Sequence, residues 1–127
     1  MSDKNLVFGH QGEQDAAERA IRQGYKLLDQ NYRTPYGEID LILMSPEQEI
    51  VFVEVKSRTS IVCGYPESAV NYRKKRHIIR SAYYYLQERY PDNDEIPWRI
   101  DIMALIYKKD RKTIIDFRWF ENVTADD

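Results

Sequence analysis

The sequence predicts one α/β domain, a mixed β-sheet flanked by helices in the order α-β-β-β-α-β-β. Two observations lead to this fold: apolar runs of strand length bounded by turn residues, and two longer stretches whose apolar residues recur at helical spacing. The length of 127 residues is typical of one domain. We therefore treat residues 1–127 as a single unit, with short polar tails at about 1–7 and 121–127.

Each element follows from a local pattern. The two predicted helices are residues 12–23 and 71–90, which Gly24 and Pro91 directly follow as stop signals. The five predicted strands are residues 25–32, 38–44, 49–57, 98–107 and 113–120. A loop is expected at residues 61–66. The second and third strands are joined by a short polar turn, so they are expected to form an antiparallel hairpin.

Three charged residues stand inside the apolar strands of this hairpin. Asp40 interrupts the apolar residues of the second strand, and Glu54 and Lys56 interrupt those of the third. Charged side chains are rarely buried unless they are paired, hydrogen-bonded or bound to a metal. These three residues therefore mark the candidate functional site.

The strand pattern predicts that the three charges converge. Side chains alternate between the two faces of a strand, so Glu54 and Lys56 share one face. Asp40 and Glu54 are equally distant from Glu47 in the sequence. A hairpin centred there puts them opposite each other, with Cβ atoms about 4.5–5.5 Å apart. A shift of one residue in the pairing would send one carboxylate to the other face.

Two adjacent carboxylates favour a cation between them, and Mg²⁺ binds through one or two carboxylates together with substrate phosphate oxygens. A bound ion can acidify a water molecule for attack on a phosphodiester, and Lys56 would orient that water or stabilise charge on the phosphate. The Glu-x-Lys triplet alone is a weak signal, since roughly 0.6 are expected by chance in such a chain. The alternative is a solvated strand end with a Glu54–Lys56 ion pair.

Several stretches resemble the YraN-like family of small bacterial proteins. In order along the chain they are Gly12-Glu13, Asn31-Tyr32-Arg33, Gly37 to Ile42, Val51 to Arg58, Gly64 to Val70 and Arg99 to Ile102. Together they extend from about Phe8 to Phe120. That family is similar to archaeal Holliday-junction resolvases and belongs to the restriction-endonuclease-like superfamily, whose hallmark is Asp…Glu-x-Lys.

The resemblance implies a restriction-endonuclease-like fold and a metal-dependent endonuclease acting on DNA, in particular on branched or junction DNA. Asp40, Glu54 and Lys56 would be catalytic. Asp40, Glu54 and Glu13 would hold Mg²⁺ or Mn²⁺, although a carboxylate near the start of a helix, such as Glu13, is also favourable against the helix dipole. Junction resolvases are typically dimers, so a homodimer is expected. The alternative is a catalytically inactive nucleic-acid-binding or protein-interaction module of the same fold.

Basic residues provide candidate contacts to phosphates. The candidate nucleic-acid-binding residues are Arg33, Arg58, Arg73, Lys74, Arg76 and Arg80. Those of the second helix, together with Tyr84, would form a strip suited to backbone contact and base stacking. Several cations in the first turn of a helix are unfavourable, unless the helix starts earlier, at Pro66 and Glu67. The alternative is a solvated helix face.

Other residues point to structure more than to chemistry. Asp101 stands in an apolar strand and is expected to form a buried structural ion pair. His10 and His77 lack the spacing of metal ligands, and Cys63 is the sole cysteine, so no internal disulfide is possible.

The net charge of −2 argues against a non-specific nucleic-acid coat. No run approaches the roughly 18 apolar residues of a membrane span. A secretory signal is also not visible, so we expect a cytoplasmic protein with nucleic acid, DNA in particular, as its partner.

Overall fold

The computed structural model describes residues 3–59, 72–92 and 95–123, except for the side chains of residues 3–7, 72 and 73. Its elements in chain order are α1 (Asp3–Arg22), β1 (Lys26–Thr34), β2 (Gly37–Met44), β3 (Ile50–Arg58), α2 (Tyr72–Arg89), β4 (Trp98–Tyr107) and β5 (Ile114–Phe120). This order is the predicted one. The predicted loop at 61–66 and the motif at 64–70 lie outside the described residues.

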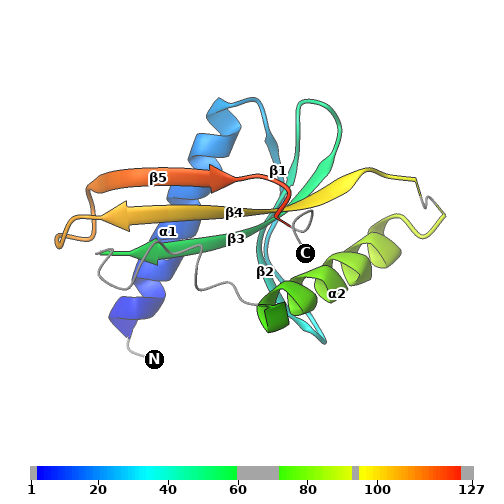
Figure 1. Cartoon of the computed structure of the whole chain (residues 1–127), viewed down its shortest axis with the longest axis horizontal. Helices are drawn as coiled ribbons and strands as arrows, with labels where there is room; N and C mark the ends of the chain where they lie inside the picture. The colour runs from blue at the N-terminus through cyan, green and yellow to red at the C-terminus, as the bar shows by residue number, and fades with distance from the viewer. Residues whose placement is uncertain (1–2, 60–71, 93–94, 124–127) are drawn as a thin grey trace.

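The five strands form one mixed sheet in the order β1-β2-β3-β4-β5 (Figure 1). Neighbouring strands are antiparallel except for β3 and β4, which run parallel. A parallel pair needs a long crossover connection, and α2 lies within it. The predicted α/β architecture is confirmed, and it is consistent with a restriction-endonuclease-like fold.

The two helices cover opposite faces of the sheet (Figure 1). On the α1 face, Ala16, Ala17 and Ala20 pack against Leu41, Leu43, Val51, Val53, Met103, Leu105 and Tyr107. On the α2 face, Ile78, Ala82 and Tyr85 pack against Ile39, Ile42, Ile50, Phe52 and Ile100. None of the helices in the described part of the chain combines the length and apolar character that crossing a bilayer requires.

The predicted start of the first helix is wrong. The helix begins at Asp3 and not at Gly12, so it takes up most of the stretch assigned to an N-terminal tail. The residue at the predicted start, Gly12, stands inside the helix, where glycine is normally destabilising. It is buried at the point where α1 crosses β3, and an added Cβ would overlap the Oγ of Ser57. Gly12 therefore permits a close helix–strand approach.

Candidate metal site

The hairpin has the predicted register. Leu41 pairs with Val53 and Ile42 with Phe52, which puts Asp40 across from Glu54. The paired region ends at Leu41, and beyond it the backbone N–H of Val55 donates to Oδ2 of Asp40 at 2.8 Å. A side chain thus takes the place of a backbone acceptor, and the two strands separate there. The Asp40 carboxyl group lies in the opening between the two strands, where their pairing ends.

Three carboxylates meet at this opening. Oxygens of Glu13 on α1 and of Glu38 and Asp40 on β2 all lie within 4.8 Å of one another. Asn31 on β1 bridges two of them, donating from Nδ2 to Oε1 of Glu13 at 2.8 Å and to Oε1 of Glu38 at 3.0 Å. The backbone of Asn31 has φ of 50°, a left-handed conformation that asparagine tolerates better than most residues. We call Glu13, Glu38 and Asp40 the acid cluster.

Glu54 lies next to this cluster and is neutralised by two lysines. Only 7% of it is exposed. Its Oε1 contacts Nζ of Lys56 at 3.2 Å and Nζ of Lys74, from the first turns of α2, at 2.9 Å. The Glu54–Lys56 ion pair is therefore present, but at a buried position and not at a solvated strand end. The anionic partner also offsets the unfavourable position of Lys74 near the helix N-terminus.

The pKa values of Asp40 and Lys56 are shifted in opposite directions. Burial, and then the charge of Glu54, raises the pKa of Asp40 to about 8, against the opposing hydrogen bond from Val55; Glu13 raises it further. Burial and the neighbouring Lys74 lower the pKa of Lys56. A carboxyl group with such a pKa holds a proton at neutral pH unless a cation replaces it.

The donor set of the acid cluster suits a hard divalent cation. It offers carboxylate oxygens from three residues, the ligand type that Mg²⁺, Mn²⁺ and Ca²⁺ prefer. A softer nitrogen donor is close by, because Nδ1 of His10 lies 3.4 Å from Oε1 of Glu13. The residues present therefore fit the ion that the sequence predicts.

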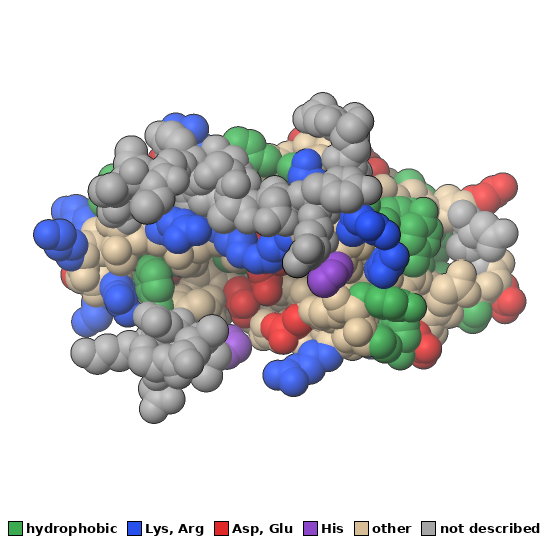
Figure 2. Space-filling view, turned by 60° about the horizontal axis from the view of Figure 1, so that its bottom comes forward, with side chains coloured by type: hydrophobic (Ala, Val, Ile, Leu, Met, Phe, Trp, Pro, Cys, Tyr) green, Lys and Arg blue, Asp and Glu red, His purple; other side chains and the backbone are tan. Residues whose placement is uncertain are grey.

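The predicted phosphate-binding residues lie in different surroundings. The side chain of Arg33 is 87% exposed, with Nε 3.6 Å from Glu38, and Arg58 is exposed at the end of β3. Arg76 and Arg80 are exposed on α2, while the side chain of Arg73 is outside the described residues. Seen from the side of α2 and the start of α1, acidic side chains lie in the middle of the surface with Lys and Arg side chains on either side (Figure 2).

Sequence reasoning missed three parts of the site: Glu38, Asn31 and the pairing of Lys74 with Glu54. Strand alternation was a usable signal for Glu38, which stands two residues before Asp40. Asn31 belongs to a stretch that resembles the family, but no strand or helix pattern indicated its contact with the acids. Its position depends on an irregularity in the β1–β2 ladder between Leu27 and Asp29 and on its own left-handed backbone.

The expectation for Asp101 is confirmed. Asp101 is fully buried on β4 and accepts hydrogen bonds from Nε of Arg99, from Nε1 of Trp119 at 2.8 Å and from the backbone N–H of Asn122 at 2.9 Å. It forms a structural ion pair on β4, which β3 separates from the β2 strand of the acid cluster.

Comparison with known proteins places the chain in a family. Residues 12–105 match the family model described as uncharacterised protein family UPF0102. A UPF0102 protein of Syntrophotalea carbinolica is 40% identical over 117 residues, 92% of this chain and 93% of that protein. Another, of Thermodesulfovibrio yellowstonii, is 41% identical over 104 residues, 82% and 89% of the two chains. The chain therefore belongs to the UPF0102 family, the YraN-like family that its motifs resemble.

Proposed function

We propose that this protein is a metal-dependent endonuclease that hydrolyses phosphodiester bonds in DNA. The observation that carries the proposal is the acid cluster itself. Three carboxylates from α1 and β2 converge on one opening, near the partly buried Lys56, and the pKa of Asp40 is raised to about 8. Such an arrangement destabilises the protein unless it serves a ligand.

Glu13, Glu38 and Asp40 would hold the ion, Mg²⁺ or Mn²⁺, and Glu54 would complete the set through Oε2, since both lysines contact its Oε1. When bound, the ion supplies an acidified water and polarises the phosphoryl group. Asn31 holds Glu13 and Glu38 in place through its two hydrogen bonds, which orients these carboxylates before the ion arrives.

Lys56 is the group that acts on the phosphate in this scheme. Glu54 is shared between two ammonium groups, so Lys56 can turn toward a phosphate oxygen while Lys74 keeps Glu54 neutralised. An ammonium placed there stabilises the charge that develops on the phosphate during attack. Its lowered pKa also lets it give up a proton more readily than an exposed lysine.

Branched or junction DNA is the substrate we favour, on the resemblance to junction resolvases, with a homodimer as the active form in the cytoplasm. A second candidate function, a catalytically inactive nucleic-acid-binding module, is favoured by one observation. Both lysines at the site are engaged by Glu54, so neither is presented to a phosphate until that pairing loosens.

Cleavage of labelled junction, flap and single-stranded DNA with Mg²⁺ or Mn²⁺ tests the proposal. We expect metal-dependent cleavage by the wild type and a loss of at least about 100-fold in Asp40→Asn and Lys56→Ala. Glu18→Gln, an exposed acid on the helix that carries Glu13, and Lys109→Ala, an exposed lysine after β4, serve as matched controls. Absence of cleavage by the wild type, with DNA binding retained, would favour the binding module.

A further inference from the structure

A hollow of about 520 Å³ lies on the outer side of α2, beside the β1–β2 turn. It is lined by Tyr36, Arg80, Tyr83, Tyr84, Gln87 and Glu88. The five helical residues follow the spacing i, i+3, i+4, i+7 and i+8, so they form one stripe along α2. Tyr36 comes from the turn and closes the hollow on one side. We call these six residues the aromatic hollow.

The turn is fixed against the helix, so the hollow is a built feature. Oγ1 of Thr34 lies 2.8 Å from Oγ of Ser81 on α2, and the backbone N–H of Tyr36 donates to the same Oγ1 at 3.0 Å. On the opposite wall, the ring of Tyr83 packs edge-on against Trp98, with centroids 5.3 Å apart. Both rims are therefore anchored to the folded core.

The lining is suited to a flat ligand. Tyr36 is 46% exposed and Tyr83 54% exposed, so both present aromatic surface to solvent. The guanidinium carbon of Arg80 lies 5.9 Å from the centroid of the Tyr36 ring, a second planar group of the same wall. Aromatic rings and arginine planes stack on nucleobases of any sequence. The carboxylate of Glu88 disfavours a phosphate within the hollow itself.

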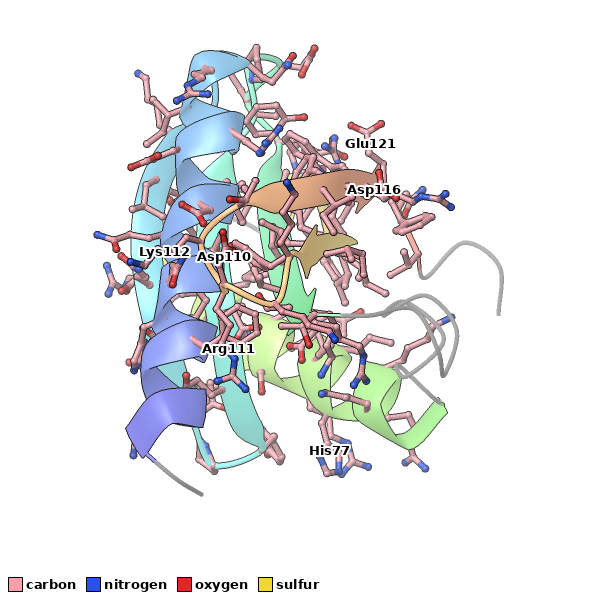
Figure 3. All side chains as sticks on the ribbon, turned by 90° about the vertical axis from the view of Figure 1, so that its left-hand side faces the viewer. His77, Asp110, Arg111, Lys112, Asp116 and Glu121 are labelled. Carbon is pink, nitrogen blue, oxygen red and sulfur yellow. The ribbon has the colours of Figure 1, made fainter. Side chains whose placement is uncertain are left out.

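A cationic surface leads from the hollow toward the acid cluster. Arg76 and His77 precede Arg80 by one helical turn, and His77 projects from α2 away from the sheet (Figure 3). One turn before them, Lys74 reaches Glu54. Lys74 and Tyr84 are ten positions apart, which corresponds to about 15 Å along the helix. Phosphates of a strand lying on the cationic part would thus bring a nearby base to the hollow.

We propose that the aromatic hollow binds an unpaired nucleobase of the DNA strand presented to the acid cluster. The inference rests on the proposed function and specifies its substrate: DNA with unpaired nucleotides a short distance along the strand from the scissile phosphate. Base faces inside a duplex are covered by their stacked neighbours, so only an unpaired base offers a face to Tyr36 and Tyr84.

Binding without divalent ions tests the inference. Anisotropy of a labelled oligonucleotide of about ten thymidines is compared with that of an abasic oligonucleotide carrying the same phosphates, in EDTA and low salt. We expect the wild type to bind the base-carrying strand about tenfold more tightly. Tyr36→Ala and Tyr84→Ala should each remove most of this preference and leave abasic binding unchanged, whereas Tyr36→Phe and Tyr84→Phe should retain it.

Equal binding of the two oligonucleotides by the wild type would overturn the inference, as would a preference that survives both alanine substitutions. Tyr36 stands on an exposed turn, so its loss leaves the core intact, which thermal unfolding will verify. Because no metal is present, the result is independent of cleavage. Base preference without metal-dependent cleavage would reject the nuclease activity and support base binding in the aromatic hollow. Cleavage without base preference would support the nuclease activity and reject base binding in the hollow.

Discussion

Asp101 and Asp40 are buried acids of the same sheet with opposite surroundings. Asp101 receives hydrogen bonds from three donors, among them Arg99, whose guanidinium also contacts Glu49 at 2.6 Å and the hydroxyl of Tyr25 at 2.8 Å. Every charge in that group has a partner. It connects β4 to β5 and to the residues that precede β1 and β3, and Arg99 contacts the carboxylates of both Asp101 and Glu49.

Asp40 receives a single hydrogen bond from the described residues, from the N–H of Val55, and lies beside the carboxylates of Glu13 and Glu38. Removing a paired buried acid leaves its cation buried without a partner, which is costly, whereas an acid surrounded by other acids itself lowers stability when it is charged. The difference between Asp101 and Asp40 therefore separates a structural cluster from the proposed metal site within a single sheet.

Removing the paired acid should have the largest effect. Asp101→Ala leaves the buried guanidinium of Arg99 without its main partner, so we expect a loss of about 3–5 kcal/mol in the free energy of unfolding. The matched control is Asp116→Ala on β5 (Figure 3), whose ion pair with Arg118 at 3.2 Å is exposed. That change should cost less than about 1 kcal/mol. Similar losses in urea unfolding of both variants would show that the buried ion pair of Asp101 contributes no more to stability than the exposed pair of Asp116.

Replacing Asp40 should have the opposite effect and increase the free energy of unfolding. The pKa of Asp40 rises from 3.8 to about 8 on folding, so its contribution to stability is fully present below pH 3.8 and is lost as the pH rises toward 8. Asp40→Asn carries no such loss and can still accept from Val55. In EDTA the free energy of unfolding of this variant should therefore exceed that of the wild type by about 1–3 kcal/mol at pH 8 and by much less at pH 5. A variant destabilised at both pH values in urea titrations would contradict this.

The approach of α1 to β3 should have the smallest effect on stability. In Gly12→Ala the new methyl group meets Ser57, which should cost about 1–2 kcal/mol and move Glu13 away from Asp40. Gly9→Ala is the matched control, because its Cβ meets nothing within 4 Å, and it should be neutral or stabilising. Unfolding and Mn²⁺ affinity are measured for both. If Gly12→Ala behaves like Gly9→Ala, the close approach does not position Glu13.

Local patterns predicted most of the fold and the hairpin of the site. The symmetry of Asp40 and Glu54 about Glu47 was sufficient for the register, because a two-residue period leaves few alternatives. The bounds of β4 followed from its apolar run and its flanking polar residues. The helix start was wrongly placed at Gly12. The residue that requires glycine there, Ser57, lies far away in the sequence.

The full composition of the site depends on contacts between elements that no local pattern encodes. Lys74 reaches Glu54 only because α2 crosses the sheet at that point. Asn31 reaches Glu13 only through an irregular, left-handed stretch of β1. Sequence reasoning thus identified the acids that interrupt apolar runs, and missed Glu38 at the start of β2 and the contacts of Asn31 and Lys74, which come from other elements.

Calorimetric titration with Mn²⁺ at pH 8 tests the central claim, that the acid cluster is a cation site. We expect the wild type and Glu18→Gln to bind the ion equally, and Asp40→Asn to show no binding. At pH 6 the wild-type affinity should fall by about tenfold or more, because the ion must displace the proton of Asp40. Equal Mn²⁺ binding by the wild type and Asp40→Asn, or none by the wild type, would contradict the account.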